Sequence, residues 1–422
     1  MESEGLDEIR ALLAKAGRSL EWLLDAIRRE DPEFPTHLGV TRVTVKNIGE
    51  KKGFCSRCFR LTFHFDADES TSAPSEYSVV LKLPTDEFVV AEFQQLDFSQ
   101  EALASLTRVV FRHHNIECRA YSLLRGLQST GFPIPRVFVA EQHDGEQRGL
   151  ILMEDMSKAG AATLPIHQSL TAEQCVDFAR WIADFQAFVH SLPADSWRDR
   201  FRACLFIHED DAESEDMKKQ LKLVYDFRPH DQNGVIQRFL DLNLRKHAEY
   251  ALRKRPEELG VSMLCHGDTW ANNVMLRRNA DGSVGSGIAA LLDWALLFEG
   301  NPLFDIARFV VCGADAEVRR ACVPRVLDAF HSRLAERLGR PPPFTREQAD
   351  ELFELAAVHQ TAALLEFFKW IALPQFAATA DGVERAKGEK LWLRVRFALE
   401  DAAQLMDKHA IDERFRLDRA DG

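Results

Sequence analysis

The hydrophobic period of the 422-residue chain changes along its length, and this change constrains the fold more than any other feature. Between residues 40 and 155 apolar and polar residues alternate, most clearly over 59–65, as in half-buried strands. Over 171–260 and again over 303–410 the apolar residues have helical spacing. The pattern therefore predicts an α+β protein, with an N-terminal antiparallel sheet followed by a larger helical part.

Breaks in this pattern indicate where the parts of the chain begin and end. Apolar spacing predicts one leading helix over 6–29, which Pro32 and Pro35 then end. A second helix is predicted over 109–127, inside the strand-rich region. The predicted parts are an N-terminal helical extension (1–39), a β-rich lobe (40–155), a helical lobe with one β-hairpin (156–410) and a charged tail (411–422).

Composition excludes several classes of protein. There are 66 acidic against 53 basic residues, a formal charge of −13, which argues against a broad nucleic-acid interface. No apolar run approaches the roughly 20 residues that span a bilayer. Eight cysteines in 422 residues are too few for a disulfide scaffold. We therefore expect a cytosolic protein that binds neither nucleic acid nor membrane, and the sequence leaves its oligomeric state open.

The strongest signal for chemistry is the string CHGDTWANN at residues 265–273, followed by Asp293 after a predicted hairpin. Phosphoryl transfer needs a carboxylate for the attacking hydroxyl and hard oxygen ligands for Mg²⁺. Asp268 would be the base, and Asn273 and Asp293 the metal ligands. Each residue alone is equally typical of a turn or a helix cap. The complete string is what favours phosphoryl transfer.

This string resembles the signature of the aminoglycoside phosphotransferase and choline kinase superfamily, whose members are similar to protein kinases in fold. Three longer strings resemble the choline-kinase-like (ecdysteroid-kinase-like) branch, especially its nematode members. They are CHGDTWANNVM at 265–275, NPLFDIAR at 301–308 and NIGEKKGFCS at 47–56. The resemblance covers roughly residues 40–380. It implies a two-lobe, protein-kinase-like fold and an ATP- and Mg²⁺-dependent small-molecule kinase that transfers the γ-phosphate to an alcohol hydroxyl.

Such a kinase needs a cation on the nucleotide phosphates, held by a carboxylate from a helix. Lys82 lies on a strand predicted over 77–83, and Glu117 lies in the helix predicted over 109–127. A carboxylate beside an apolar stripe is costly to bury without a partner, so an ion pair between the two is expected. The alternative for both residues is a solvated surface position.

Other nucleotide contacts are expected at a turn and at a hinge. The turn at 49–56 lacks G-x-G-x-x-G, but its backbone N–H groups could approach the phosphates. The segment 154–156 follows a buried strand, and its backbone would bind the adenine edge, although a plain loop is equally compatible with it. Besides Lys82 and Glu117, the predicted nucleotide-binding residues are Gly49, Gly53, Phe54, Ser56, Glu154 and Met156.

The resemblance implies a supporting role for His266 and Asp305, which would organise the loop around Asp268. A general-base role for His266 is the alternative. Trp270, Trp294 and Trp370 could form an aromatic wall for the acceptor, or could simply be core residues.

The acceptor itself stays open among ecdysteroid- or sterol-like, choline-like and glycoside-like alcohols. A catalytically inactive, kinase-like nucleotide-binding module is the alternative function. A protein kinase is disfavoured, because the Asp-Phe-Gly and Ala-Pro-Glu strings are missing.

Overall fold

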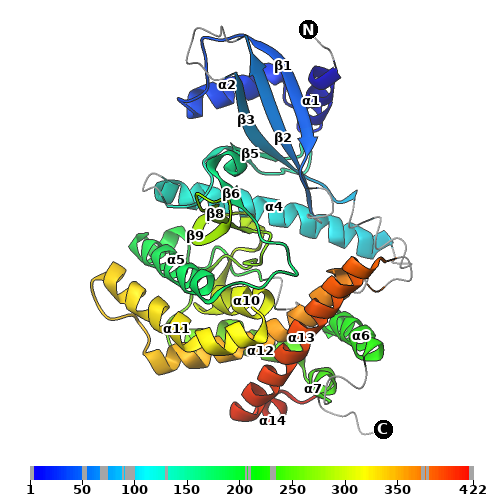
Figure 1. Ribbon diagram of the computed structural model, residues 1–422, viewed down its shortest axis with the longest axis vertical. Helices are drawn as coiled ribbons and strands as arrows, with labels where there is room; N and C mark the ends of the chain where they lie inside the picture. The colour runs from blue at the N-terminus through cyan, green and yellow to red at the C-terminus, as the bar shows by residue number, and fades with distance from the viewer. Residues whose placement is uncertain are drawn as a thin grey trace. The chain divides into compact units, whose positions relative to one another are not determined.

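The computed structural model describes most of the chain, in two compact units. The described residues are 4–49, 55–66, 75–87, 90, 100–128, 132–204, 207, 211–228, 234–371, 376 and 380–417. The first unit is Met1–Ala161 together with Ala289–Ala295, and the second is Ala162–Ile288 together with Leu296–Gly422. Figure 1 follows the chain in colour from blue to red.

The first unit is built on a five-stranded sheet in the order β1-β2-β3-β5-β4, with every neighbouring pair antiparallel. The central strand β3 pairs with β2 through Lys82 and Cys58, and with β5 through Lys82 and Ile151. The main elements are α1 (Glu4–Ala14), α2 (Leu20–Glu30), β1 (Val40–Asn47), β2 (Ser56–Phe65), β3 (Glu76–Pro84), α4 (Gln100–Gln128), β4 (Val137–Glu141), β5 (Leu150–Glu154) and the short helix η1 (Met156–Ala159).

Two helices, and not the single one predicted over 6–29, precede the sheet (Figure 1). Gly17 has φ +65°, a left-handed conformation that a continuous helix cannot contain. Two residues later, the Ser19 hydroxyl accepts a hydrogen bond from Trp22 N at 3.2 Å and starts α2. The apolar faces of α1 and α2 pack with Val79, Leu81 and Leu83 in one core on the sheet. Strand alternation therefore turns the intervening Lys82 to the other face.

The second unit is mainly helical. Its long helices are α5 (Ala172–Ser191), α6 (Asp211–Phe227), α11 (Ala316–Leu338), α12 (Arg346–Ile371) and α13 (Gly382–Lys408). The shorter ones are η2 (Ala194–Ser196), α7 (Val235–Asp241), α8 (Leu244–Glu249), the π-helix η3 (Tyr250–Lys254), α9 (Arg255–Glu258), α10 (Phe304–Gly313) and α14 (Ile411–Phe415). Its strands are β7 (Met263–Cys265), β8 (Val274–Arg278) and β10 (Phe298–Gly300). The boundary between the two units falls within β6 (Ala161–Ala162), β9 (Val284–Leu291) and η4 (Trp294–Leu296).

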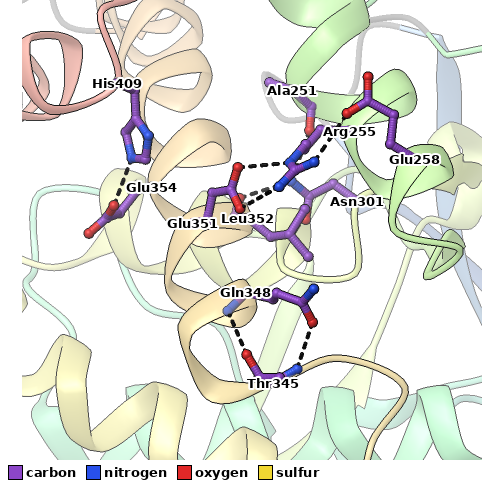
Figure 2. Close-up of polar contacts among 10 residues, drawn as sticks. All are labelled: Ala251, Arg255, Glu258, Asn301, Thr345, Gln348, Glu351, Leu352, Glu354 and His409. Atoms are coloured by element: carbon purple, nitrogen blue, oxygen red, sulfur yellow. Dashed lines mark hydrogen bonds and ion pairs between the residues drawn. The ribbon is translucent and has the colours of Figure 1, made fainter.

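Asn301, in the segment between β10 and α10, joins several parts of this unit (Figure 2). Its side chain is buried, and its Nδ2 donates to Ala251 O and to Leu352 O, both at 2.9 Å. Its carbonyl accepts from Cys265 Sγ at 3.0 Å, at the end of β7. The strand that leads into residues 266–273 is thereby fixed to the helices behind it.

The predicted α+β class is confirmed: an antiparallel sheet with one long helix comes first, and a larger helical part follows. Within the described ranges, no helix is both long enough and apolar enough to cross a membrane.

Candidate active site

In the first unit, the Lys82 ammonium group contacts two carboxylates from separate parts of the chain. Its Nζ lies 2.6 Å from Glu117 Oε2 on α4, and 2.9 Å from Asp293 Oδ1 beyond β9. The Glu117 side chain is 1% exposed and that of Asp293 is 38% exposed. The ion pair expected between Lys82 and Glu117 is therefore present, and a second, more accessible carboxylate shares the same ammonium group.

Burial and neighbouring charges shift the pKa values of this cluster in opposite directions. Burial alone would lower the pKa of Lys82, but the Asp293 and Glu117 carboxylates reverse this and hold it well above its usual value. Burial raises the pKa of Glu117 to about 7, although Lys82 opposes the shift. Lys82 thus remains a buried cation at neutral pH, and part of its neutralising charge comes from a residue that solvent can reach.

Asp293 has an unusual backbone conformation, with φ +64°. Asp tolerates the left-handed region better than most residues, yet the conformation still costs free energy. It occurs at the sharp turn between β9 and η4, and it is where the carboxylate reaches Lys82. Strain of this kind is frequent where a side chain must be aimed for function.

In the second unit, the loop after β7 is held by Asp305 at the start of α10. The Asp305 carboxylate is completely buried and accepts hydrogen bonds from His266 N at 2.8 Å and Gly267 N at 2.9 Å. Burial raises the pKa of Asp305 to about 6, while these two hydrogen bonds oppose the shift. Gly267 has φ +89°, and a Cβ there would lie 2.1 Å from Leu296 O. The loop can therefore take this path only with glycine at 267.

The loop presents Asp268 with both carboxylate oxygens engaged. Asn273 Nδ2 donates to Asp268 Oδ2 at 2.8 Å and to Asp268 O at 3.0 Å. The buried His266 ring accepts from Asp268 N through Nδ1 at 3.1 Å, so this nitrogen serves the backbone. The Asp268 side chain remains 19% exposed. Of the two candidate bases, Asp268 is the one with a partly exposed side chain.

Arg308 is a site residue that the sequence reasoning did not identify. Its Nη2 donates to Asp268 Oδ1 at 2.6 Å, and its side chain is 10% exposed. A signal existed in the string NPLFDIAR, because Asp305 and Arg308 are three residues apart and share one face of a helix. Sequence alone does not tell which loop that face meets.

The predicted nucleotide contacts occupy different parts of the first unit. Gly49 N donates to Asn47 Oδ1 at 3.1 Å just beyond β1, and Ser56 begins β2. Glu154 ends β5, and its carboxylate accepts from Arg136 Nε at 2.9 Å. Two of the remaining predicted positions, Gly53 and Phe54, lie outside the described residues, and Met156 begins η1.

The three tryptophans predicted for an acceptor wall have different surroundings. Trp270 is partly exposed and makes an edge-to-face contact with Phe367, with ring centroids 4.6 Å apart. Trp294 is completely buried and its Nε1 donates to Leu291 O at 3.3 Å, so it packs as a core residue and does not line a pocket. Trp370 lies in α12, and its side chain is outside the described residues.

Both predicted metal ligands, Asn273 and Asp293, carry an oxygen atom suited to a hard cation. Because the Asn273 Nδ2 donates to Asp268, the amide oxygen is the atom left for an ion. Asp293 offers a partly exposed carboxylate. In the described stretches, no group of three or more His, Cys, Asp or Glu residues could hold a metal on its own. Each of these two residues by itself offers an oxygen atom of the kind that Mg²⁺ binds alongside phosphate and water ligands.

Two curated relatives, both from Caenorhabditis elegans, are similar to this chain. "Uncharacterized oxidoreductase dhs-27" is 22% identical over 76% of this chain, and the match covers 38% of that relative. The chain thus spans well under half of the length of this relative. "Uncharacterized kinase-like protein D1044.1" is 25% identical over 74% of this chain and 78% of its own length.

Among solved structures, a GDP complex of an aminoglycoside 2'-phosphotransferase-IIIa is 12% identical, with a TM-score of 0.42, over 90% of this chain and 97% of its own. An amicoumacin kinase in complex with AMP-PNP and Ca²⁺ is 12% identical, with a TM-score of 0.39, over 96% of both chains.

The family model that matches carries the description "Uncharacterized oxidoreductase dhs-27", and the match extends over residues 34–408, nearly the whole chain. Together with the nematode relatives, this confirms the resemblance to a nematode kinase-like family. The chain belongs to the DUF1679 family.

Proposed function

We propose that this chain is an ATP- and Mg²⁺-dependent kinase that transfers the γ-phosphate to an alcohol hydroxyl of a small molecule. The observation that carries the proposal is the buried Lys82, which keeps its charge between Glu117 and Asp293. A buried cation with two carboxylates is a poor way to gain stability, because desolvation offsets most of the attraction. Such a cluster is common where a protein binds a charged ligand.

Five polar residues have roles in this proposed reaction. Lys82 contacts the nucleotide phosphates, and Glu117 fixes the position of its ammonium group. Asn273 and Asp293 hold Mg²⁺, which neutralises charge on the phosphate oxygens when it is bound. Asp268 accepts a hydrogen bond from the attacking hydroxyl and takes its proton as the phosphoryl group transfers.

The remaining predicted residues support these roles. Asp305 and His266 keep the Asp268 loop in place through backbone hydrogen bonds. Backbone groups of the turn at Gly49 and Ser56 contact the nucleotide phosphates, and those of the hinge at Glu154 and Met156 contact its adenine.

The name of one relative suggests a different activity. That relative is called an oxidoreductase, but only 38% of it is matched. The 422 residues contain no G-x-G-x-x-G string, the fingerprint of dinucleotide binding. The other relative is called kinase-like and is matched over 78% of its length, which favours the kinase.

Thermal unfolding with and without Mg²⁺–ATP tests nucleotide binding first. A ligand specific to the native state must stabilise it, by about 2.7 kcal/mol at a concentration 100 times its Kd. We expect the midpoint of unfolding to rise with Mg²⁺–ATP and to change little with Mg²⁺ alone. No rise at millimolar ATP would contradict the proposal.

A transfer screen then identifies the acceptor and tests the alternative function. Radiolabelled ATP is offered with ecdysteroid- and sterol-like, choline-like and glycoside-like alcohols, and phosphorylated products are separated. We expect one class to accept phosphate, with the Trp270–Phe367 pair as part of its binding surface. Nucleotide binding without transfer to any alcohol or to water would favour the inactive binding module.

A further inference from the structure

The carboxylate of Asp268 is fixed by two residues, of which only Asn273 belongs to the predicted set. Asn273 engages Oδ2 at 2.8 Å, and Arg308 engages Oδ1 at 2.6 Å. With one partner the carboxylate could still rotate about its Cβ–Cγ bond. With one partner on each oxygen, its plane is defined before any substrate arrives.

Arg308 is itself held at a second point. Its Nη1 donates to Gln360 Oε1 at 3.2 Å, and Gln360 is a completely buried residue of α12. Asp305, one turn earlier on α10, fixes the backbone of the same loop. A single face of α10 therefore controls both the path of the loop and the orientation of its carboxylate.

The charge of Arg308 is retained despite its burial. Burial would lower the pKa of the guanidinium, but the neighbouring Asp268 carboxylate holds it above its usual value. The loose transition state of phosphoryl transfer depends more on positioning the hydroxyl than on removing its proton early. A charged group that fixes the Asp268 carboxylate can therefore affect the rate without touching the substrate.

We propose that Arg308 is a positioning residue for phosphoryl transfer, which fixes the carboxylate of Asp268 for the attacking hydroxyl. This inference rests on the proposed kinase function. It predicts that loss of Arg308 lowers the rate of transfer and leaves nucleotide binding intact, because Arg308 acts only through Asp268.

The chain offers a matched control in a second buried Arg–Asp pair. Arg319 Nη2 lies 2.6 Å from Asp401 Oδ2, and the two side chains are 6% and 25% exposed. This pair joins α11 to α13, its side chains have exposures similar to those of the Arg308 pair, and Asp401 also accepts from Arg320 Nε at 2.7 Å. Replacing Arg319 therefore removes a buried guanidinium from an Arg–Asp pair without touching the Asp268 loop.

The experiment compares Arg308→Ala, Arg308→Lys and Arg319→Ala with the wild type. The readout is hydrolysis of the γ-phosphate of Mg²⁺–ATP, with water as the acceptor, and transfer to any alcohol that the screen has identified. For Arg308→Ala we expect kcat to fall about 100-fold and KM for ATP to stay within about twofold. Arg308→Lys keeps the charge and should lose about tenfold at most. Arg319→Ala should keep kcat and lose only stability.

Chemical rescue separates positioning from a purely structural role. Guanidinium ion at millimolar concentration should restore about tenfold or more of the kcat lost in Arg308→Ala, because it can occupy the place of the missing group. Urea, of the same shape but neutral, should restore nothing. Rescue by both, rescue by neither, or an Arg308→Ala kcat close to that of the wild type would overturn the inference. A wild-type chain that neither hydrolyses nor transfers phosphate would overturn the proposed function itself.

Discussion

Lys82 has two partners that differ in exposure, a buried Glu117 and a partly exposed Asp293. Variants of Lys82 and Glu117 can therefore show which residue matters for stability and which for nucleotide binding. Lys82→Met leaves the Glu117 carboxylate buried without its cation, which should lower the free energy of unfolding by about 3 kcal/mol. Adding Glu117→Met removes the uncompensated charge and should recover most of that loss.

Denaturant unfolding measures the stability of these variants, and calorimetric titration measures their affinity for Mg²⁺–ATP. Both variants should lose at least about tenfold in affinity, because the cation for the phosphates is absent in each. If affinity returned together with stability in the double variant, Lys82 would not be the phosphate-binding residue.

The backbone conformation of Asp293 allows its effect on stability to be measured separately from its effect on Mg²⁺ binding. Its φ of +64° suits Asn, but costs Ala about 1–2 kcal/mol. Asp293→Asn and Asp293→Ala should therefore both weaken the dependence of ATP binding on Mg²⁺, and only Asp293→Ala should lower stability. The measurement is a magnesium titration of ATP affinity in each variant. An unchanged titration in Asp293→Asn would count against the role of this carboxylate as a ligand.

At the scale of an element, α4 buries two histidines and a glutamate whose titration changes stability with opposite signs. Burial lowers the pKa of His113 and of His114 to about 4, against 6.5 for a free histidine. Burial raises the pKa of Glu117 to about 7, against 4.5. As pH falls from 6.5 to 4, the unfolded chain protonates the histidines before the folded chain does, so the histidines lower stability. Over pH 7 to 4.5 the folded chain protonates Glu117 first, so Glu117 raises stability.

Replacing both histidines of α4 by Gln should remove the loss of stability that they cause as pH falls, and should keep the contribution of Glu117. Relative to wild type, the free energy of unfolding of His113→Gln/His114→Gln should rise as pH falls from 6.5 to 4, by at most about 3 kcal/mol for each histidine. Denaturant unfolding at several pH values measures this difference, and the absolute stability of the variant does not enter. Parallel pH profiles for the two proteins would show that the histidines are not held neutral.

At the scale of the whole molecule, sequence periodicity predicts most of the elements. Strands expected at 59–65, at 77–83 and just before 154 are present as β2, β3 and β5, each paired on both sides. Alternating burial marks β2, and a continuous apolar run marks the buried strand β5. The leading helix was predicted as one and is two, since its apolar spacing continues across Gly17 and only the left-handed turn there separates α1 from α2. The three-residue strands β7 and β10 are too short to show a period.

The candidate site was predictable where a residue type and its spacing carry the chemistry. Asp268 and Asn273 stand in one string, and the pairing of Lys82 with Glu117 follows from the cost of burying a carboxylate alone. Arg308 was not predictable, because its role depends on the packing of α10 against the loop at 266–268. The burial of Trp294 agrees with the core alternative that the sequence leaves open, since a tryptophan in a motif can face either substrate or core.

The central claim, that Asp268 carries out transfer from a nucleotide bound through other residues, is tested most directly by comparing wild type with Asp268→Asn. The measurement is release or transfer of the labelled γ-phosphate from Mg²⁺–ATP, with the affinity for Mg²⁺–ATP determined on the same samples. Asp268→Asn should bind Mg²⁺–ATP with wild-type affinity and lose about 1,000-fold or more in turnover. Wild-type turnover in Asp268→Asn, or a wild-type chain that does not bind Mg²⁺–ATP, would contradict the account.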